Sequence, residues 1–366
     1  MASREAFCIP MTEKLKSALY SIFLPLRTKE HSTFVLLRRG LEKLRHKNGA
    51  FLAASGEDYK AVWIRDQVYA SYAYYYLDEV TEFARGLQVV FDILRTSRTK
   101  IEHALCEKPR TGKDFIHAKY DANALCEVTD DWGHHQVDAI GLFLFAVARA
   151  ERRGVRVIRD NEDRAMLQLL VHYLAAVRYF RKPDNGMWEE NLDLHTSSLG
   201  AAVAGLRELA RMNLAVVPEY LIQAGEETMQ AILPNESPSR DVDMAQLSLL
   251  WPYKMVPRAV ADVILARVKE KLVQSHGLNR YWGDNYYRSH NGISGEWTMG
   301  FFWLAIIYAD RREYEEAREW FKRGIATMTP EGYLPELYQN GRPNDHTPLA
   351  WAHSLALIAG VKIGEF

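Results

Sequence analysis

The chain has 366 residues, of which 48% are hydrophobic and 25% charged, and its formal net charge is −1. This composition is typical of a globular protein with a large core, and the charge balance excludes a strongly basic or acidic protein that would favour nucleic acid or an anionic membrane as partner. Three cysteines, Cys8, Cys106 and Cys126, share no CxxC spacing. They argue against a zinc site or a disulfide framework and favour a reducing, cytoplasmic compartment.

The first 30 residues are expected to form an N-terminal extension. Its apolar run, Ala18–Leu26, is too short to cross a bilayer and no cleavage site follows it, so we interpret it as a surface or packing helix rather than a signal peptide. No other run is long enough to span a membrane.

From residue 31 onward, apolar residues recur every three to four positions and strand-like alternation is nearly absent. The pattern predicts helices at 31–46, 65–78, 80–97, 135–152, 159–180, 196–211, 216–233, 240–250, 256–275, 295–310, 312–327 and 347–361.

The connections between these helices alternate in length. Those after the even-numbered helices are short, whereas most of those before them exceed the usual median of about 4–6 residues. Helical hairpins joined in this way place all the long loops at one end. Six such hairpins closed in a ring form an all-α (α/α)6 barrel with an inner and an outer ring of helices. We expect this barrel to be a single domain over residues 31–366. The alternative, an open α-solenoid, is disfavoured because the period is irregular and no repeat is visible.

The second predicted helix begins with Trp63-Ile64-Arg65-Asp66-Gln67. In a first helical turn, Arg65 can donate and Asp66 can accept, so together they can hold neighbouring sugar hydroxyls. The alternative is an Asp placed favourably by the helix dipole beside a solvated Arg.

Asp130-Asp131-Trp132-Gly133-His134-His135-Gln136-Val137-Asp138 precedes the fourth predicted helix. Adjacent histidines rarely chelate one metal ion and no established spacing is present, so neither a metal nor another cofactor is expected. Gln136 and Asp138 fit hydroxyl binding or a structural role, and Trp132 can stack on a sugar.

Pro183-Asp184-Asn185-Gly186-Met187-Trp188-Glu189-Glu190 places two carboxyl groups beside an indole. An apolar wall raises the pKa of a carboxyl group, which makes Glu189 or Glu190 a candidate general acid beside Trp188. Two solvated glutamates at a helix entry are the alternative.

Two later segments are rich in aromatic or acidic residues. Around Arg280, Trp282 and Trp297, rings and polar groups alternate in the way that suits the apolar face and hydroxyl rim of a sugar. Trp303, Trp320 and Trp351 fall within predicted helices and are interpreted as core. Glu336, after Pro335, can serve as a general base, although an ordinary loop glutamate explains it as well.

Six motifs that follow one another along the chain resemble those of glycoside hydrolase family 15, the family of glucoamylases and glucodextranases. They are also similar to the glucoamylase-like domain of the phosphorylase kinase α and β subunits. They are Trp63-x-Arg65-Asp66, Gln136-x-Asp138, Pro183-Asp184-x-Gly186-x-Trp188-Glu189-Glu190, Gly277-Leu278-x-Arg280-Tyr281-x-x-Asp284-x-Tyr286, Pro335-Glu336 and Pro348-Leu349-x-Trp351-x-His353-Ser354.

The resemblance implies exo-acting hydrolysis with inversion, which releases β-glucose from the non-reducing end of an α-glucoside. It makes Glu189 the general acid and Glu336 the general base, with Glu190, Arg65, Asp66 and Arg280 holding the sugar. Inversion predicts carboxyl groups about 6.5–9.5 Å apart, with Glu189 protonated and Glu336 ionised.

The chain has neither the β-sandwich nor the starch-binding domain of many family members, which favours short, neutral maltose- or isomaltose-type substrates. We expect a cytoplasmic monomer or small homo-oligomer. Two rival functions remain: a sugar-sensing or regulatory subunit without catalysis, and another (α/α)6 enzyme such as a glycuronyl hydrolase or an epimerase, for which His353 is the one supporting histidine.

Overall fold

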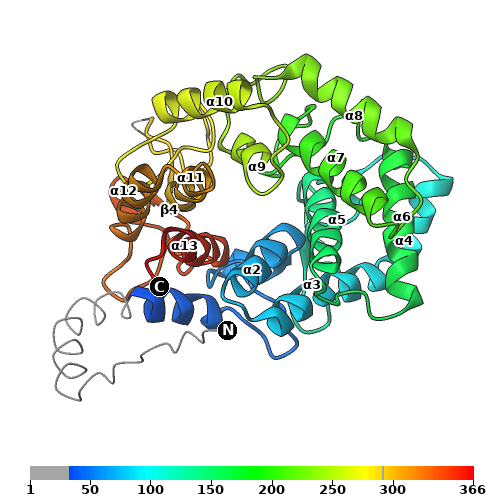
Figure 1. Ribbon diagram of the computed structural model, residues 1–366, viewed down its shortest axis with the longest axis horizontal. Coiled ribbons are helices and arrows are strands. Elements are labelled where there is room, and N and C mark those ends of the chain that lie inside the picture. Colours follow the sequence, from blue (N-terminus) through cyan, green and yellow to red (C-terminus); the bar gives the residue numbers. More distant parts are fainter. Residues whose placement is uncertain (1–32, 291) are drawn as a thin grey trace, which may run out of the picture.

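The inner ring of the molecule is built from helices that are buried on nearly every side. The computed structural model describes residues 33–290 and 292–366. Each inner helix contacts the next, and the last contacts the first, which closes the ring (Figure 1). The inner helices are α2 (Ile64–Tyr76), α5 (Val137–Arg152), α7 (Thr196–Arg211), α9 (Leu247–Leu250), α11 (Met299–Asp310) and α13 (Ala350–Ile363).

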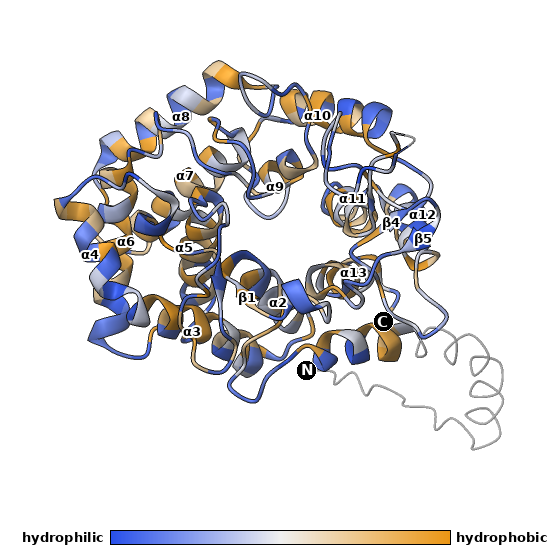
Figure 2. Cartoon of the chain, turned by 180° about the vertical axis from the view of Figure 1, so that it is seen from behind, coloured by the Kyte–Doolittle hydropathy of each residue, from blue (hydrophilic) through white to orange (hydrophobic). Residues whose placement is uncertain are grey.

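The outer ring consists of amphipathic helices. In α12, for example, the buried residues Ala317, Trp320, Phe321 and Gly324 follow a spacing of three to four, which defines one apolar face. Figure 2 shows blue and orange alternating along α8 and α10. The outer helices are helical residues 33–43, α3 (Val80–Thr96), α4 (Arg98–Cys106), α6 (Asn161–Val177), α8 (Glu219–Ile232), α10 (Arg258–Lys271) and α12 (Tyr314–Ile325).

Small residues allow the inner helices α5 and α7 to approach closely. A Cβ added at Gly141 of α5 would lie 2.3 Å from the main chain of Ala201, and one added at Gly205 would lie 2.6 Å from the Gly141 carbonyl oxygen. Neither distance is compatible with a side chain, so glycine is required where these two helices cross.

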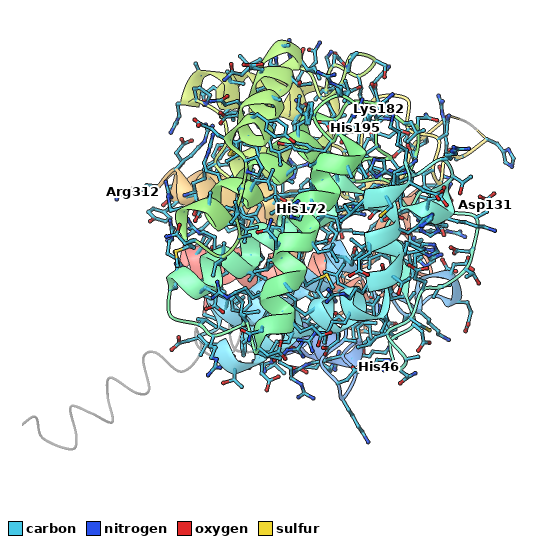
Figure 3. The ribbon with its side chains drawn as sticks, turned by 90° about the vertical axis from the view of Figure 1, so that its right-hand side faces the viewer. His46, Asp131, His172, Lys182, His195 and Arg312 are labelled. Atoms are coloured by element: carbon cyan, nitrogen blue, oxygen red, sulfur yellow. The ribbon has the colours of Figure 1, made fainter. Side chains whose placement is uncertain are left out.

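The two ends of the barrel differ in their connections. Short turns follow the inner helices, and long segments precede them. In the side view of Figure 3, Asp131, from the long segment before α5, lies at one end of the barrel, and Arg312, from the turn after α11, lies at the other. The N-terminal ends of the inner helices therefore face the long loops.

Short strands and 3₁₀ turns stiffen these loops. Strand β1 (Val62–Trp63) pairs antiparallel with β2 (Lys119–Tyr120), and β4 (Leu337–Gln339) pairs antiparallel with both β3 (Glu296–Trp297) and β5 (Arg342–Pro343). The 3₁₀ turns are η1 (Glu57–Tyr59), η2 (Gly112–Asp114) and η3 (Met244–Gln246).

The structure confirms the all-α (α/α)6 barrel and corrects some of its elements. The helix predicted at 240–250 is reduced to η3 and α9, because Asp243 is extended and its carboxylate caps the amide of Ala245. Helix α4 was not predicted, and neither were the strands, which are too short to show alternation.

Cys106 and Cys126 are free and exposed. The predicted extension over residues 1–30, with Ala18–Leu26 and Cys8, lies outside the described residues. Within the described ranges, every helix is too short or too polar to cross a lipid bilayer.

Candidate active site

A cavity of about 230 Å³ opens at the long-loop end of the barrel. This volume lies slightly below the range of about 300–1,000 Å³ that is usual for sites of drug-sized ligands, so it suits a ligand of about one sugar ring. Its lining comes from loops far apart in the sequence: Ala53, Tyr59, Trp63, Arg65, Asp66, Asp131, Trp132, Gly133, Met187, Trp188, Glu189, Glu190, Arg280, Tyr286, Trp297, Glu336, Leu349 and Trp351.

Glu189 is held in an unusual backbone conformation. Its φ is +63°, a left-handed value that costs a non-glycine residue on the order of 1–3 kcal/mol and tends to occur at functional sites. Hydrogen bonds from the Glu190 amide to the Asn185 carbonyl (3.1 Å) and from Asn185 Nδ2 to the Glu190 carbonyl (2.6 Å) close the turn. A Cβ at Gly133 would lie 2.3 Å from the Glu189 carbonyl oxygen, so only glycine fits there.

The Glu189 carboxyl group is surrounded by hydrogen-bond donors. Arg65 donates to Oε1 at 2.7 Å, and Trp63 Nε1 donates to Oε2 at 3.1 Å. The indole of Trp132 donates to the same Oε2. With side-chain exposures of 4% for Arg65 and 9% for Glu189, this ion pair is almost entirely buried.

Asp138 and Gln136 fix the position of Arg65 from behind the cavity. Arg65 donates to Asp138 Oδ2 at 3.0 Å and to Gln136 Oε1 at 3.4 Å. Neither residue lines the cavity, so each orients the guanidinium without facing a ligand. Asp66 does line it. Burial raises the pKa of Asp66 to about 7, although the nearby Arg65 charge acts in the opposite direction.

Glu190 belongs to a second buried ion-pair cluster. It accepts hydrogen bonds from Arg280 and from the Tyr281 hydroxyl, and Arg280 also donates to both carboxylate oxygens of Asp284, each at 2.7 Å. The Arg280 guanidinium lies 4.8 Å from the ring centre of Tyr286. The cluster gives the cavity a rigid polar edge next to aromatic rings.

Glu336 is fully buried, directly before β4. Its amide donates to the His346 carbonyl at 3.1 Å, and its carbonyl accepts from the Thr298 amide at 3.2 Å. Asn344 donates to Oε2 at 2.6 Å, whereas Oε1 has no hydrogen-bond partner in the described part of the chain. Burial raises the pKa of Glu336 to about 7, against the lowering effects of the Asn344 hydrogen bond and of the nearby Tyr59 hydroxyl.

The groups around the two candidate catalytic carboxyls differ from those expected from the sequence. In the described part of the chain, the polar groups that contact the Glu189 carboxyl are all hydrogen-bond donors, one of them cationic. Trp188, expected to shield Glu189, instead donates to Asp243 Oδ1 at 2.8 Å. Burial raises the pKa of Glu336, the residue expected to be ionised, to about 7.

Unpartnered polar atoms gather in residues of the cavity wall. Among the described residues these are Glu336 Oε1, the indole nitrogens of Trp297 and Trp351, and Arg65 Nε. A buried polar atom without a partner costs roughly 1–3 kcal/mol, and such atoms point to a functional role or a ligand. A cavity wall that combines hydrogen-bond donors and acceptors with indole rings suits a sugar, because a sugar ring has hydroxyl groups on its rim and an apolar face.

Most of the predicted site residues meet in this cavity. Trp63, Arg65, Asp66, Trp132, Trp188, Glu189, Glu190, Arg280, Trp297 and Glu336 line it, whereas Trp282 is 76% exposed and does not. Sequence reasoning missed Tyr59 and interpreted Trp351 as core. Trp351 occupies the first turn of α13, as Arg65 does in α2, and that shared position was the available signal.

The histidines considered above serve in packing. His134 stacks on His117 and His135 on Phe115, with ring centres 3.9 Å apart in each pair. His353 lies outside the cavity, and its two ring nitrogens bond the Leu334 amide and the Leu37 carbonyl, both at 2.9 Å. The histidine considered in support of an epimerase is therefore structural.

Comparison with known proteins identifies the family. The profile described as "Glycosyl hydrolases family 15" matches residues 44–233, more than half of the chain. Among curated proteins, the liver isoform of phosphorylase b kinase regulatory subunit alpha from Mus musculus is 26% identical over 390 residues, covering 85% of this chain and 31% of its own length. A probable alpha subunit from Caenorhabditis elegans is 26% identical over 386 residues, covering 84% and 31%.

The chain thus spans about a third of the length of the curated relatives it matches. Among solved structures, a wild-type glycosidase has a TM-score of 0.80 at 21% identity, covering 93% of this chain and 99% of its own. A glycosidase variant in complex with glucose has a TM-score of 0.79 at 22% identity, with the same coverage. The glucoamylase from Saccharomycopsis fibuligera has a TM-score of 0.67 at 13% identity, covering 93% and 96%.

At these identities the structural matches establish the fold alone, and they agree with the closed helical ring described above. The family is established by the sequence profile, which covers the segments that carry Arg65, Asp138 and Glu189. The chain belongs to glycosyl hydrolase family 15.

Proposed function

We propose that the chain is an inverting, exo-acting α-glucoside hydrolase that releases β-glucose from the non-reducing end of short α-glucosides. The observation that carries this proposal is that Glu189 and Glu336, which are 147 positions apart in the sequence, line the same cavity together with arginine, aspartate and indole groups. Glycoside hydrolysis uses two such carboxyl groups on opposite sides of the sugar.

In this proposal Glu336 acts as the general base. Its Oε1 forms no hydrogen bond within normal distance among the described residues, although the Tyr59 hydroxyl lies close enough to lower the pKa of the carboxyl. In the proposal this oxygen accepts the proton of the attacking water. Asn344 on Oε2 and the two main-chain hydrogen bonds fix the direction of the carboxyl group. Since the pKa of Glu336 is about 7, the ionised base becomes more abundant as the pH rises through that value.

Glu189 acts as the general acid once a sugar occupies the cavity. Arg65 donates to its Oε1 at 2.7 Å. Sugar hydroxyls that engage the guanidinium of Arg65 would compete with this contact and release the Glu189 carboxyl from it. Asp138 keeps Arg65 in place during the exchange, because it holds the other arm of the guanidinium at 3.0 Å.

Substrate selection follows from the shape and polarity of the cavity. A volume of about 230 Å³ suits one terminal glucose unit, with Asp66 and Glu190 as acceptors for its hydroxyls and Trp297 and Trp351 in the cavity wall. We therefore propose maltose- and isomaltose-type oligosaccharides as substrates, with no metal or other cofactor, in the cytoplasm.

Glucose release from maltose, isomaltose and trehalose tests the activity, with purified wild-type protein and the Glu189→Gln and Glu336→Gln variants. We expect release from at least one disaccharide and a loss of roughly 100-fold or more in each variant, the usual contribution of a general acid or base. Wild-type rates in either variant would remove that residue from the mechanism.

A second candidate function is a non-catalytic, glucose-sensing subunit. Two observations favour it: the curated relatives are named regulatory subunits, and the Glu189 carboxyl is held by three donors. Under this alternative the wild-type protein binds glucose in calorimetry but releases none from any disaccharide. Binding without turnover would thus replace the first proposal with the second.

A further inference from the structure

A second cavity, of about 150 Å³, lies at the opposite end of the barrel. It is formed where inner helices end: Tyr72 and Tyr76 come from the C-terminal half of α2, and Arg149 and Arg153 from the end of α5. Arg65, at the start of α2, is 11 residues from Tyr76, or about 16 Å at the helical rise of about 1.5 Å per residue. This cavity is therefore separate from the candidate active site.

The charges around this cavity are strongly unbalanced. Four cationic residues line it, Arg149, Arg153, Lys254 and Lys362, and Asp310 is the one carboxylate among its lining residues. Both lysines already contact Asp310, Lys254 at 2.9 Å. In the described part of the chain, neither arginine has a carboxylate within ion-pair distance.

The nearby acid Glu208 does not balance the two arginines. It forms ion pairs with Arg152 at 3.3 Å and with Arg211 at 3.0 Å. Arg149 and Arg153 contact aromatic faces instead: Arg149 lies 5.6 Å from the Phe145 ring centre and Arg153 lies 5.1 Å from that of Tyr75. Their guanidinium groups are thus positioned without being neutralised.

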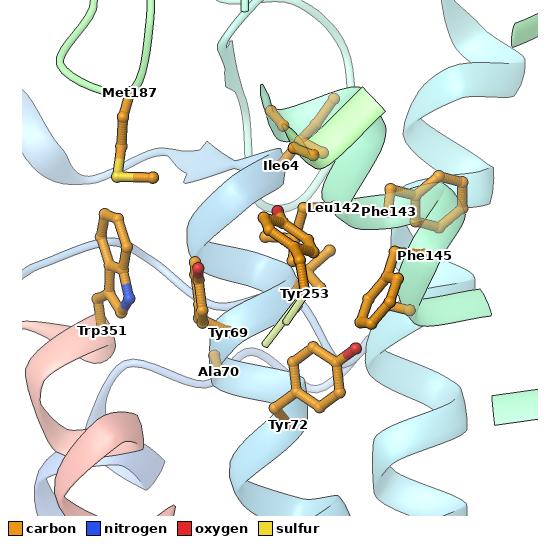
Figure 4. Packing of buried hydrophobic residues seen from close by; sticks show 14 of the residues in the cluster. Ile64, Tyr69, Ala70, Tyr72, Leu142, Phe143, Phe145, Met187, Tyr253 and Trp351 are labelled. Atoms are coloured by element: carbon orange, nitrogen blue, oxygen red, sulfur yellow. The ribbon is translucent and has the colours of Figure 1, made fainter. Parts of the chain in front are cut away.

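Tyr72 adds a buried donor to the wall of this cavity. Its side chain is 7% exposed, and its hydroxyl has no hydrogen-bond partner among the described residues. In Figure 4 the hydroxyl oxygen lies on the side of the ring next to Phe145 of α5. Burial raises the pKa of Tyr72, with Tyr76 acting in the same direction and Arg149 and Arg153 in the opposite one. The hydroxyl therefore remains a neutral donor at physiological pH.

We propose that this cavity binds the phosphate group of a small phosphorylated metabolite. Guanidinium groups hold phosphate through paired, charge-assisted hydrogen bonds, and the Tyr72 hydroxyl supplies a further donor. Four cationic side chains line the cavity and Asp310 is the one carboxylate among its lining residues. A ligand with one negative charge would therefore leave positive charge unneutralised, so a ligand group with two negative charges is favoured. Aromatic rings of Tyr75, Tyr76 and Trp251 provide a surface for the remainder of the molecule, such as a sugar ring.

Isothermal titration calorimetry tests this proposal with inorganic phosphate, glucose 6-phosphate and glucose as probes. The pocket variant is Arg149→Gln/Arg153→Gln. The matched control is Arg156→Gln/Arg164→Gln, which removes the same charge from two exposed arginines that do not line the cavity. Tyr72→Phe is a milder second variant, and it should fold normally because the hydroxyl it removes has no partner to lose.

We expect the wild type and the control to bind glucose 6-phosphate equally well. The pocket variant should bind it roughly tenfold or more weakly, since a hydrogen bond to a charged group contributes about 1.5–3 kcal/mol and 1.4 kcal/mol is tenfold. Tyr72→Phe should weaken binding by a smaller factor. Tighter binding of glucose 6-phosphate than of inorganic phosphate would identify a sugar phosphate as the ligand, and equal binding would identify the phosphate alone. Absence of phosphate binding in the wild type, or equal loss in pocket and control variants, would overturn the proposal.

Discussion

Replacing Glu336 by glutamine should stabilise the protein at alkaline pH while it removes the proposed general base. The side chain is fully buried, and its pKa is raised by burial from about 4.5 to about 7. Glutamine has nearly the same shape, carries no charge, and can still accept the hydrogen bond from Asn344 through its amide oxygen. The substitution therefore changes the electrostatics more than the packing.

The size of the effect follows from linkage between protonation and folding. Because the folded-state pKa is raised, the folded state favours the protonated form, and the associated stability is fully present below pH 4.5 and is lost as the pH rises through about 7. The rise in pKa from about 4.5 to about 7, at about 1.4 kcal/mol for each pH unit, corresponds to about 3.5 kcal/mol. The free energy of unfolding of Glu336→Gln, relative to wild type, should rise by about this amount between pH 4.5 and 8.

Urea denaturation followed by circular dichroism at several pH values measures this difference. Buried acids that do not interact with Glu336, such as Asp184, whose pKa burial raises to about 6, are present in both proteins, so their contributions cancel. Substitution of an exposed glutamate, Glu227→Gln, serves as the control and should leave the difference flat. A flat difference for Glu336→Gln as well would show that burial does not perturb Glu336, and the reasoning about the base would fail.

Three further predictions concern activity and the turn that carries Glu189. If the wild type hydrolyses a disaccharide, kcat/KM should rise with pH through about 7, because the base must be ionised; a pH profile that falls through this range would assign the raised pKa to the acid instead. Gly133→Ala should lower the free energy of unfolding by roughly 1–3 kcal/mol and reduce turnover, because its Cβ would meet the Glu189 carbonyl oxygen at 2.3 Å; unchanged activity and melting temperature would contradict the close approach. Arg65→Lys should weaken glucose binding despite the retained charge, because a lysine cannot contact Asp138 and Glu189 at once as the guanidinium does. Calorimetry measures the affinity for glucose, and wild-type affinity in the variant would show that the two-armed guanidinium is not needed.

Much of the fold could be predicted because its signals are local. The apolar face of α12 and the small residues at the crossing of α5 and α7 are visible in the sequence. The helix predicted at 240–250 begins later in the structure, at Met244, because Asp243 is extended and caps the amide of Ala245. Trp188 donates to the same carboxylate, and this distant contact is not visible in the sequence.

Site residues could be predicted from the sequence where they belong to a recognisable motif. Glu189 and Arg65 belong to such motifs, whereas Tyr59 comes from a 3₁₀ turn without one. Trp282 shares a motif with Arg280, yet its side chain points to solvent. The hydrogen bonds that hold the carboxyl groups of Glu189 and Glu336 come from three separate loops, and no sequence pattern encodes that arrangement.

The anomeric form of the first product tests the proposed mechanism directly. Proton NMR during early hydrolysis of maltose or isomaltose distinguishes β-glucose from α-glucose before mutarotation mixes them. We expect β-glucose from the wild-type protein, because in the proposed mechanism Glu336 directs water to the face of the sugar opposite Glu189. Initial release of α-glucose, or no glucose from any α-glucoside, would contradict this mechanism.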